Sequence, residues 1–216
     1  MSPAWSQSLE ASGRMPRSPS GGAKVARMFR GFTLAFVLGG LAGCGGSPPA
    51  TFDLTAPVAG IGGRAARGQI VVTEPNATSP VDGDRIVVRT GPEAVAFLSG
   101  AQWAERLPRL VQTRLIQTFE NGRSLRSVGR PGDKMVADSS LNSEIRRFEI
   151  NVTTGLAEVE VSAKLVGERS GRIIAAKIFS AQSPGSASDG AAAASALDAA
   201  LSQVLRQIVV WTTSQT

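Results

Sequence analysis

Two pairs of carboxylates are the residues best placed for acid–base or cation chemistry. Asp82 and Asp84 flank Gly83, while Glu158 and Glu160 alternate with apolar residues along the chain. Carboxylates in a stretch rich in Pro and Gly most often form turns, so we interpret Asp82 and Asp84 as part of a turn. Alternation is typical of a half-buried strand, and we interpret Glu158 and Glu160 as its solvated face rather than an acid–base dyad.

Other residue types that carry chemistry are scarce. The sequence contains no His and no Tyr, and the part after Cys44 has no G-x-S-x-G motif, Walker loop or C-x-x-C pair. Zinc sites and general bases most often use His. These chemistries therefore have little support from the residues, and we expect no catalytic residue, no metal site and no cofactor.

The most basic stretch lies in the middle of the chain. It contains Arg106, Arg109, Arg114, Arg123, Arg126, Arg130 and Lys134, against Glu105, Glu120 and Asp133. A solvated helix face and loop is the favoured interpretation. The alternative is contact with anionic lipid headgroups or an acidic partner, for which Arg106 and Arg109 are the candidates.

The net charge of +6 does not indicate a nucleic-acid-binding protein. The segment before Cys44 holds five basic residues and one acidic residue, whereas the rest holds 18 basic and 16 acidic residues. Most of the excess charge therefore lies in front of Cys44. We expect no nucleic acid among the partners.

The single cysteine, Cys44, lies at the end of a segment that resembles a signal peptide. Lys24, Arg27 and Arg30 precede an apolar run over residues 31–42, which is too short to span a membrane. The run ends in Leu41-Ala42-Gly43-Cys44, which resembles the lipobox of bacterial lipoproteins. The resemblance implies cleavage before Cys44 and acylation of its sulfur and amine, giving a lipid anchor in the membrane.

These features divide the chain into three parts. Residues 1–43 are predicted to be an N-terminal extension and signal peptide, residues 44–50 a flexible tether, and residues 51–216 the folded domain. Gly45 follows the cysteine, and by the sorting rule known from enteric lipoproteins it favours the outer membrane over the inner one. We expect a lipid-anchored protein of the cell envelope that faces the periplasm.

The domain is predicted to contain mostly short strands. The segment over residues 158–166 alternates most regularly, and with the segment over residues 172–181 it predicts a hairpin. The strand over residues 144–152 changes its apolar face, which predicts a bulge near Arg146 and Arg147. Further strands are expected over residues 51–55, 69–73, 85–89, 94–98 and 124–128.

Two amphipathic helices are expected to cover this sheet. The first begins between Gln102 and Leu107, ends at Gly122 and carries Trp103 on its apolar stripe. The second is capped by Asp189 or Ser188 and carries a stripe that ends at Trp211. We predict an α+β fold, an antiparallel sheet with two amphipathic helices packed on one face.

Trp103 and Trp211 have two interpretations. Core packing is favoured because both lie on the apolar stripes. The alternative is a groove between the two helices that contacts lipid.

Residues 84–122 carry a resemblance to a known family. They read DRIVVRTGPEAVAFLSGAQWAERLPRLVQTRLIQTFENG, with Ala101-Gln102-Trp103-Ala104-Glu105 as the most specific part. The sequence resembles the ABC-type transport auxiliary lipoproteins of the paraquat-inducible protein C type over roughly residues 52–211. It departs from them in having Phe97 where the family often has Tyr.

The resemblance implies a non-enzymatic role in lipid transport. Such lipoproteins accompany an Mce-domain protein with an ABC permease and ATPase, and dock the end of a periplasmic lipid-transfer tunnel at the outer membrane. Only lipid attachment at Cys44 carries over as a site. The alternative is an envelope scaffold lipoprotein with no direct lipid handling.

Overall fold

The computed structural model describes residues 47–58, 68–123 and 125–216. Residues 47–216 belong to one compact unit. Cys44, the predicted signal peptide and the first residues of the predicted tether lie outside the described residues. Ala50, the last residue of that predicted tether, belongs to the first strand.

The described residues form a nine-stranded sheet. Its strands are Ala50–Phe52 (β1), Gln69–Val72 (β2), Asn76–Ala77 (β3), Arg85–Arg89 (β4), Val95–Trp103 (β5), Ser127–Gly129 (β6), Ser139–Asn151 (β7), Leu156–Gly167 (β8) and Ile173–Pro184 (β9). The predicted strand over residues 85–89 is confirmed to the residue. β3 was not predicted, and the other strands differ from the prediction in length or bounds.

β7 is the central strand. β8 pairs with it antiparallel over its whole length, from Ser139 to Asn151. Its other edge is shared by β2, β3 and β4, which follow one another along β7 and all run parallel to it. The sheet is therefore mixed, and the prediction of a purely antiparallel sheet is wrong. The reason is that β2, β3 and β4 keep the same direction along this edge of β7, whereas a hairpin between them would reverse the direction of the chain.

The strands with the clearest apolar–polar alternation in the sequence are antiparallel. β8 pairs with β7 and β9, which confirms the predicted hairpin. The register of β7 against β8 shifts between Ile145 and Arg147. This bulge lies where the change of apolar face predicted it. β9 pairs with no strand besides β8 among the described residues and forms an edge of the sheet.

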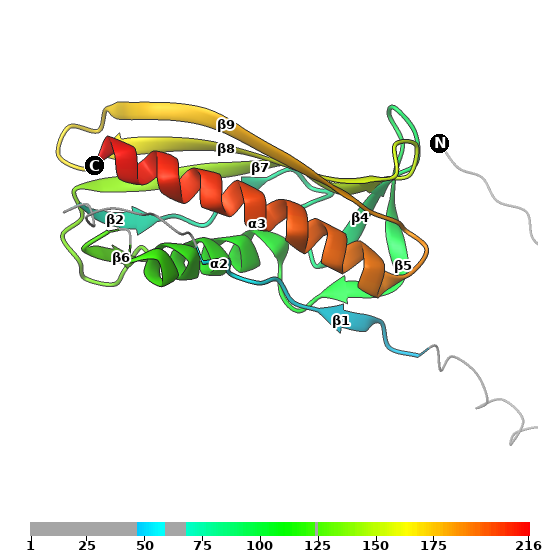
Figure 1. Ribbon diagram of the computed structural model, residues 1–216. Coiled ribbons are helices and arrows are strands. Elements are labelled where there is room, and N and C mark those ends of the chain that lie inside the picture. Colours follow the sequence, from blue (N-terminus) through cyan, green and yellow to red (C-terminus); the bar gives the residue numbers. More distant parts are fainter. Residues whose placement is uncertain (1–46, 59–67, 124) are drawn as a thin grey trace, which may run out of the picture. The chain divides into compact units, whose positions relative to one another are not determined.

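Two helices are described, Leu107–Gly122 (α2) and Gly190–Gln215 (α3). Figure 1 shows α3 running along β8 and β9 with α2 beside it, and contacts between these elements agree. Pro108 lies in the first turn of α2, where its missing N–H is not needed. Asp189 caps α3, since its carboxylate accepts the backbone N–H of Ala192 at 2.8 Å, as predicted.

The core lies between the helices and the sheet. Phe148, Val159 and Val161 from β7 and β8 are buried, as are Leu201 and Leu205 of α3. Alternation along the strands sends the intervening side chains to the opposite face. The sheet thus has one face covered by helices and one face that is open.

Candidate functional site

Trp103 is not on a helix. It is the last residue of β5, and the prediction that it begins the apolar stripe of the first helix is wrong. Its ring is only 1% exposed and meets Phe148 edge-on, with centroids 5.8 Å apart. Its backbone N–H donates to the carbonyl of Asp84. Trp103 therefore packs in the core and offers no surface to a partner in this conformation.

Arg106 lies at the N-cap position of α2 and is held by two carboxylates. Its guanidinium pairs with Glu74 at 3.1 Å and with Asp82. The hydrogen bond from the guanidinium to Asp82 raises the pKa of Arg106 above its ordinary value. The backbone N–H of Leu107 also donates to the carbonyl of Gly83 at 2.9 Å. These bonds tie the start of α2 to the loop before β4.

The same contacts explain the predicted turn around Asp82. The backbone N–H of Asp82 donates to the carbonyl of Thr78 at 2.9 Å, which closes a turn. No group of three or more His, Cys, Asp or Glu residues that could hold a metal ion is found among the described residues. Asp82 is therefore a turn residue and an ion-pair partner of Arg106, as the turn interpretation has it.

Arg109 is the more accessible of the two candidate contact residues. Its side chain is 65% exposed and pairs with Glu105, four residues earlier in the chain, at 2.9 Å. An exposed pair of this kind is worth little in stability. Arg106 and Arg109 thus lie near each other at the start of α2, one of them fixed by the loop and the other free to reach solvent.

A buried ion pair on the open face was not anticipated from the sequence. Arg89 at the end of β4 binds Glu149 of β7 through two nitrogens, at 2.5 and 3.0 Å. The Glu149 side chain is only 5% exposed. The hydrogen bond to Glu149 raises the pKa of Arg89. The sequence pattern predicts the strands that contain Arg89 and Glu149, but it does not predict that these two strands lie side by side.

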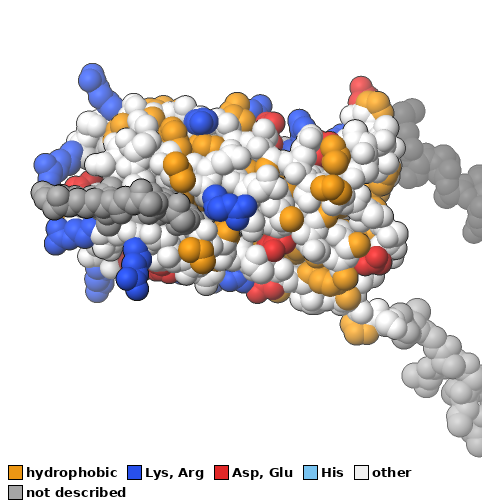
Figure 2. All heavy atoms as spheres, viewed as in Figure 1, with side chains coloured by type: hydrophobic (Ala, Val, Ile, Leu, Met, Phe, Trp, Pro, Cys, Tyr) orange, Lys and Arg blue, Asp and Glu red, His pale blue; other side chains and the backbone are white. Residues whose placement is uncertain are grey.

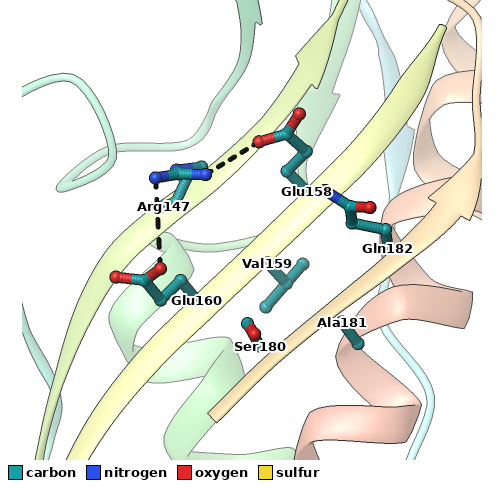
Figure 3. A pocket seen from close by; sticks show the side chains of 7 residues that line it. All are labelled: Arg147, Glu158, Val159, Glu160, Ser180, Ala181 and Gln182. Carbon is teal, nitrogen blue, oxygen red and sulfur yellow. Dashed lines mark hydrogen bonds and ion pairs between the residues drawn. The ribbon is translucent and has the colours of Figure 1, made fainter. Parts of the chain in front are cut away.

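Glu158 and Glu160 extend this network across β8. Arg147 of β7 donates to Glu158 at 2.9 Å, and Asn151 adds a second hydrogen bond at 3.2 Å. Figure 3 shows Arg147 lying between Glu158 and Glu160. Together with residues of β9, these three line a hollow of about 380 Å³. Glu158 is only 7% exposed. The interpretation of Glu158 as a solvated residue is therefore wrong, because Arg147 and Asn151 cover it.

The arrangement of these groups favours structure over reaction chemistry. Glu149 and Glu158 accept hydrogen bonds from guanidinium or amide groups, and Glu160 forms ion pairs with Arg146 and Arg147, so none is held as an unpaired base. The described residues also include no helix long and apolar enough to cross a membrane.

Two comparisons concern the sequence of the chain. The profile of a family described as ABC-type transport auxiliary lipoprotein component matches residues 52–209. An uncharacterised protein of Bradyrhizobium diazoefficiens is 32% identical over 177 residues, 78% of this chain and 47% of the relative. The chain therefore spans about half the length of this curated relative.

Two solved structures share the fold. A Xanthomonas campestris protein of known crystal structure is 28% identical, with a TM-score of 0.70, covering 77% of this chain and 96% of that protein. A second, uncharacterised protein is 14% identical with a TM-score of 0.58, covering 78% and 98% of the two chains. The second likeness concerns the fold alone.

Proposed function

Because the chain belongs to the ABC-type transport auxiliary lipoprotein family, we propose that it is the membrane-anchored auxiliary component of an Mce-type lipid transport system. In this proposal the acylated Cys44 anchors it in the outer membrane. The domain faces the periplasm and docks the end of a lipid-transfer tunnel formed by an Mce-domain protein, which works with an ABC permease and ATPase.

The family match over residues 52–209 is the observation that carries this proposal. It begins eight residues after a cysteine that ends a signal-peptide pattern. An acylated cysteine followed by a folded domain is the arrangement that a lipoprotein requires. The ion-paired state of the carboxylates supports a binding role rather than catalysis.

Arg106 and Arg109 are proposed as partner contacts. Arg109 has the exposure that a contact residue needs, and its pair with Glu105 is exposed as well. Arg106 is fixed by Glu74 and Asp82, so it holds the surface in place. Trp103 supports the same surface from the core, two residues before Glu105.

Co-purification tests the partner. The full-length chain, expressed in its native host and extracted in mild detergent, is expected to bring down the Mce-domain protein, permease and ATPase. Arg109→Glu should weaken this recovery, while Arg146→Glu on another element serves as the matched charge reversal. Recovery of the chain without any Mce-domain protein would contradict the proposal. Recovery of other envelope proteins instead would favour the scaffold alternative.

The anchor has its own test. Cys44→Ala should abolish acylation and cleavage at this site while leaving the domain folded. The mass of the mature N-terminus is the decisive measurement, because an uncleaved apolar segment can also hold the chain at a membrane. A wild-type N-terminus that begins elsewhere than Cys44, or carries no acyl group, would contradict the anchor.

A further inference from the structure

A shallow groove of about 560 Å³ lies between the C-terminal half of α3 and the edge strand β9. It is separate from the open-face network. Its lining residues are Lys177, Arg206, Gln207, Val210, Trp211 and Ser214. The α3 residues recur at spacings of one and four along the helix, so they form one largely exposed stripe, which lines the groove together with Lys177 of β9.

The floor of this α3–β9 groove is aromatic and ordered by packing. Trp211 meets Phe179 of β9 edge-on, with ring centroids 5.4 Å apart. The Lys177 amino group lies 5.3 Å from the centroid of the same Phe179 ring. The cation and the indole are thus positioned by one buried ring. Val210, which is exposed, continues the apolar surface.

The charges around the groove have one sign. Lys177 is the only ionisable side chain of β9, and Arg206 is the only one in residues 199–215 of α3. Neither forms an ion pair within residues 47–58, 68–123 and 125–216. Both side chains are exposed, and the Gln207 amide adds an uncharged donor to the lining. Figure 2, which has the view of Figure 1 with α3 on the near side, shows basic, acidic and hydrophobic side chains interspersed on that face.

We propose that the α3–β9 groove binds one anionic phospholipid. Its phosphate lies between Lys177 and Arg206, and its glycerol and first methylene groups lie on Val210 and Trp211. An apolar floor rimmed by cations without carboxylates complements an anionic amphiphile. Two cations match one phosphate group, whereas an acidic protein surface would require a more extended set of positive charges.

This site extends the proposed function by naming a ligand class for the chain itself. It lies on β9 and α3, whereas the proposed partner contacts lie at the start of α2. The lipid test uses the purified chain alone. Failure to bind lipid therefore leaves the Mce-type partnership standing, and failure to recover partners leaves the lipid site standing.

The test is a titration of the full-length chain with dihexanoyl-phosphatidylglycerol below its micelle concentration, followed by calorimetry and by Trp emission. The zwitterionic dihexanoyl-phosphatidylcholine should bind much more weakly.

Lys177→Gln/Arg206→Gln should weaken phosphatidylglycerol binding roughly 30-fold, about 1 kcal/mol for each cation. Arg169→Gln/Arg172→Gln, which removes two exposed arginines from the β8–β9 turn, is the matched control and should bind as wild type does. Trp211→Phe should remove the emission change while keeping most of the affinity.

Several outcomes would overturn the proposal. Equal affinity for the two lipids would mean that the cations do not recognise the phosphate. Equal affinity for glycerol 1-phosphate would mean that the apolar floor takes no part. An equal loss of affinity in the control variant would mean that the net charge of the protein, and not the groove, causes the binding. If the groove variants instead dissociate an oligomer in sedimentation, with lipid binding unchanged, the groove is a contact between copies.

Discussion

On the face covered by the helices, β7 and β8 present Phe148 and Val159, while on the open face the neighbouring residues are Glu149 and Glu158. All four side chains are buried. The apolar pair is buried by helices and core, but the carboxylates are buried by Arg89 and Arg147 from within the sheet. The side chains on the two faces are thus equally buried, but the two faces need different interactions to be stable. One face needs volume to be filled, and the other needs each charge to keep its partner.

The largest effect is expected on the covered face. Phe148→Ala removes the ring of a residue that is 1% exposed and meets Trp103 edge-on, and should lower the free energy of unfolding by about 3–5 kcal/mol. Urea denaturation followed by circular dichroism measures this loss. Ile178→Ala, at an exposed position of β9, is the control and should change stability by less than about 0.5 kcal/mol. Equal losses in the two variants would contradict the assignment of the core.

The open face should respond to removal of one charge and recover when both are removed. Arg89→Met leaves the Glu149 carboxylate buried without its guanidinium, and should cost about 2–3 kcal/mol in unfolding free energy. Arg89→Met/Glu149→Leu should regain most of this loss in the same denaturation experiment. A double variant no more stable than the single one would show that the pair itself, and not the orphaned charge, sets the cost.

The helix α3, which covers the apolar face, can be destabilised at its N-terminus. Asp189→Ala removes the side-chain cap of α3 and should cost about 1 kcal/mol. Ser188→Ala, beside it, should have little effect. Hydrogen exchange of the amides in the first turn of α3 should accelerate in Asp189→Ala alone. Unchanged exchange there would argue against the cap.

The smallest effect is expected at an exposed ion pair. Asp53 binds Arg114 of α2 at 2.5 Å, with 57% of the Asp53 side chain exposed. Burial by itself raises the pKa of Asp53, but the hydrogen bonds from Arg114 and from the backbone of Leu54 outweigh it, so the pKa lies below its ordinary value. Asp53→Asn should therefore cost only about 0.5 kcal/mol at neutral pH.

This contribution has a definite pH dependence. Because the folded-state pKa of Asp53 is depressed, its stabilisation is present above the unfolded-state value of about 4 and is lost as the pH falls through the folded value. The stability difference between wild type and Asp53→Asn should shrink accordingly in thermal melts at acidic pH. A difference that grows on acidification would have the wrong sign.

Local patterns predicted the elements well and their long-range pairing poorly. The strand over residues 85–89, the bulge beside Arg146 and the cap at Asp189 each leave a mark within a few residues of sequence. Trp103 was misplaced because it lies four residues before Leu107, which imitates a helical stripe. Gly100, with φ of 71°, interrupts the alternation of β5 and hides the end of the strand.

The candidate sites divide in the same way. The lipobox around Cys44 is contiguous in sequence and could be recognised directly, whereas Arg89 and Glu149 are sixty residues apart. Their pairing depends on β4 lying parallel to β7, and no local period encodes that choice. The α3–β9 groove likewise brings Lys177 and Arg206 together through tertiary packing, although the helical stripe predicts the position of Trp211.

The position of β7 also bears on how the chain folds. The strands β2, β3 and β4 are all synthesised before Ser139, yet the edge on which they line up belongs to residues 139–151. A nascent chain that ends before β7 can pair β4 with β5 and β2 with β6, but it has no strand that joins these pairs into one sheet. These pairings span long loops, and closing them costs conformational entropy before any strand contact is gained. These strand pairs must therefore wait for β7 before they join, and truncation before residue 139 should leave a chain unable to form the complete sheet.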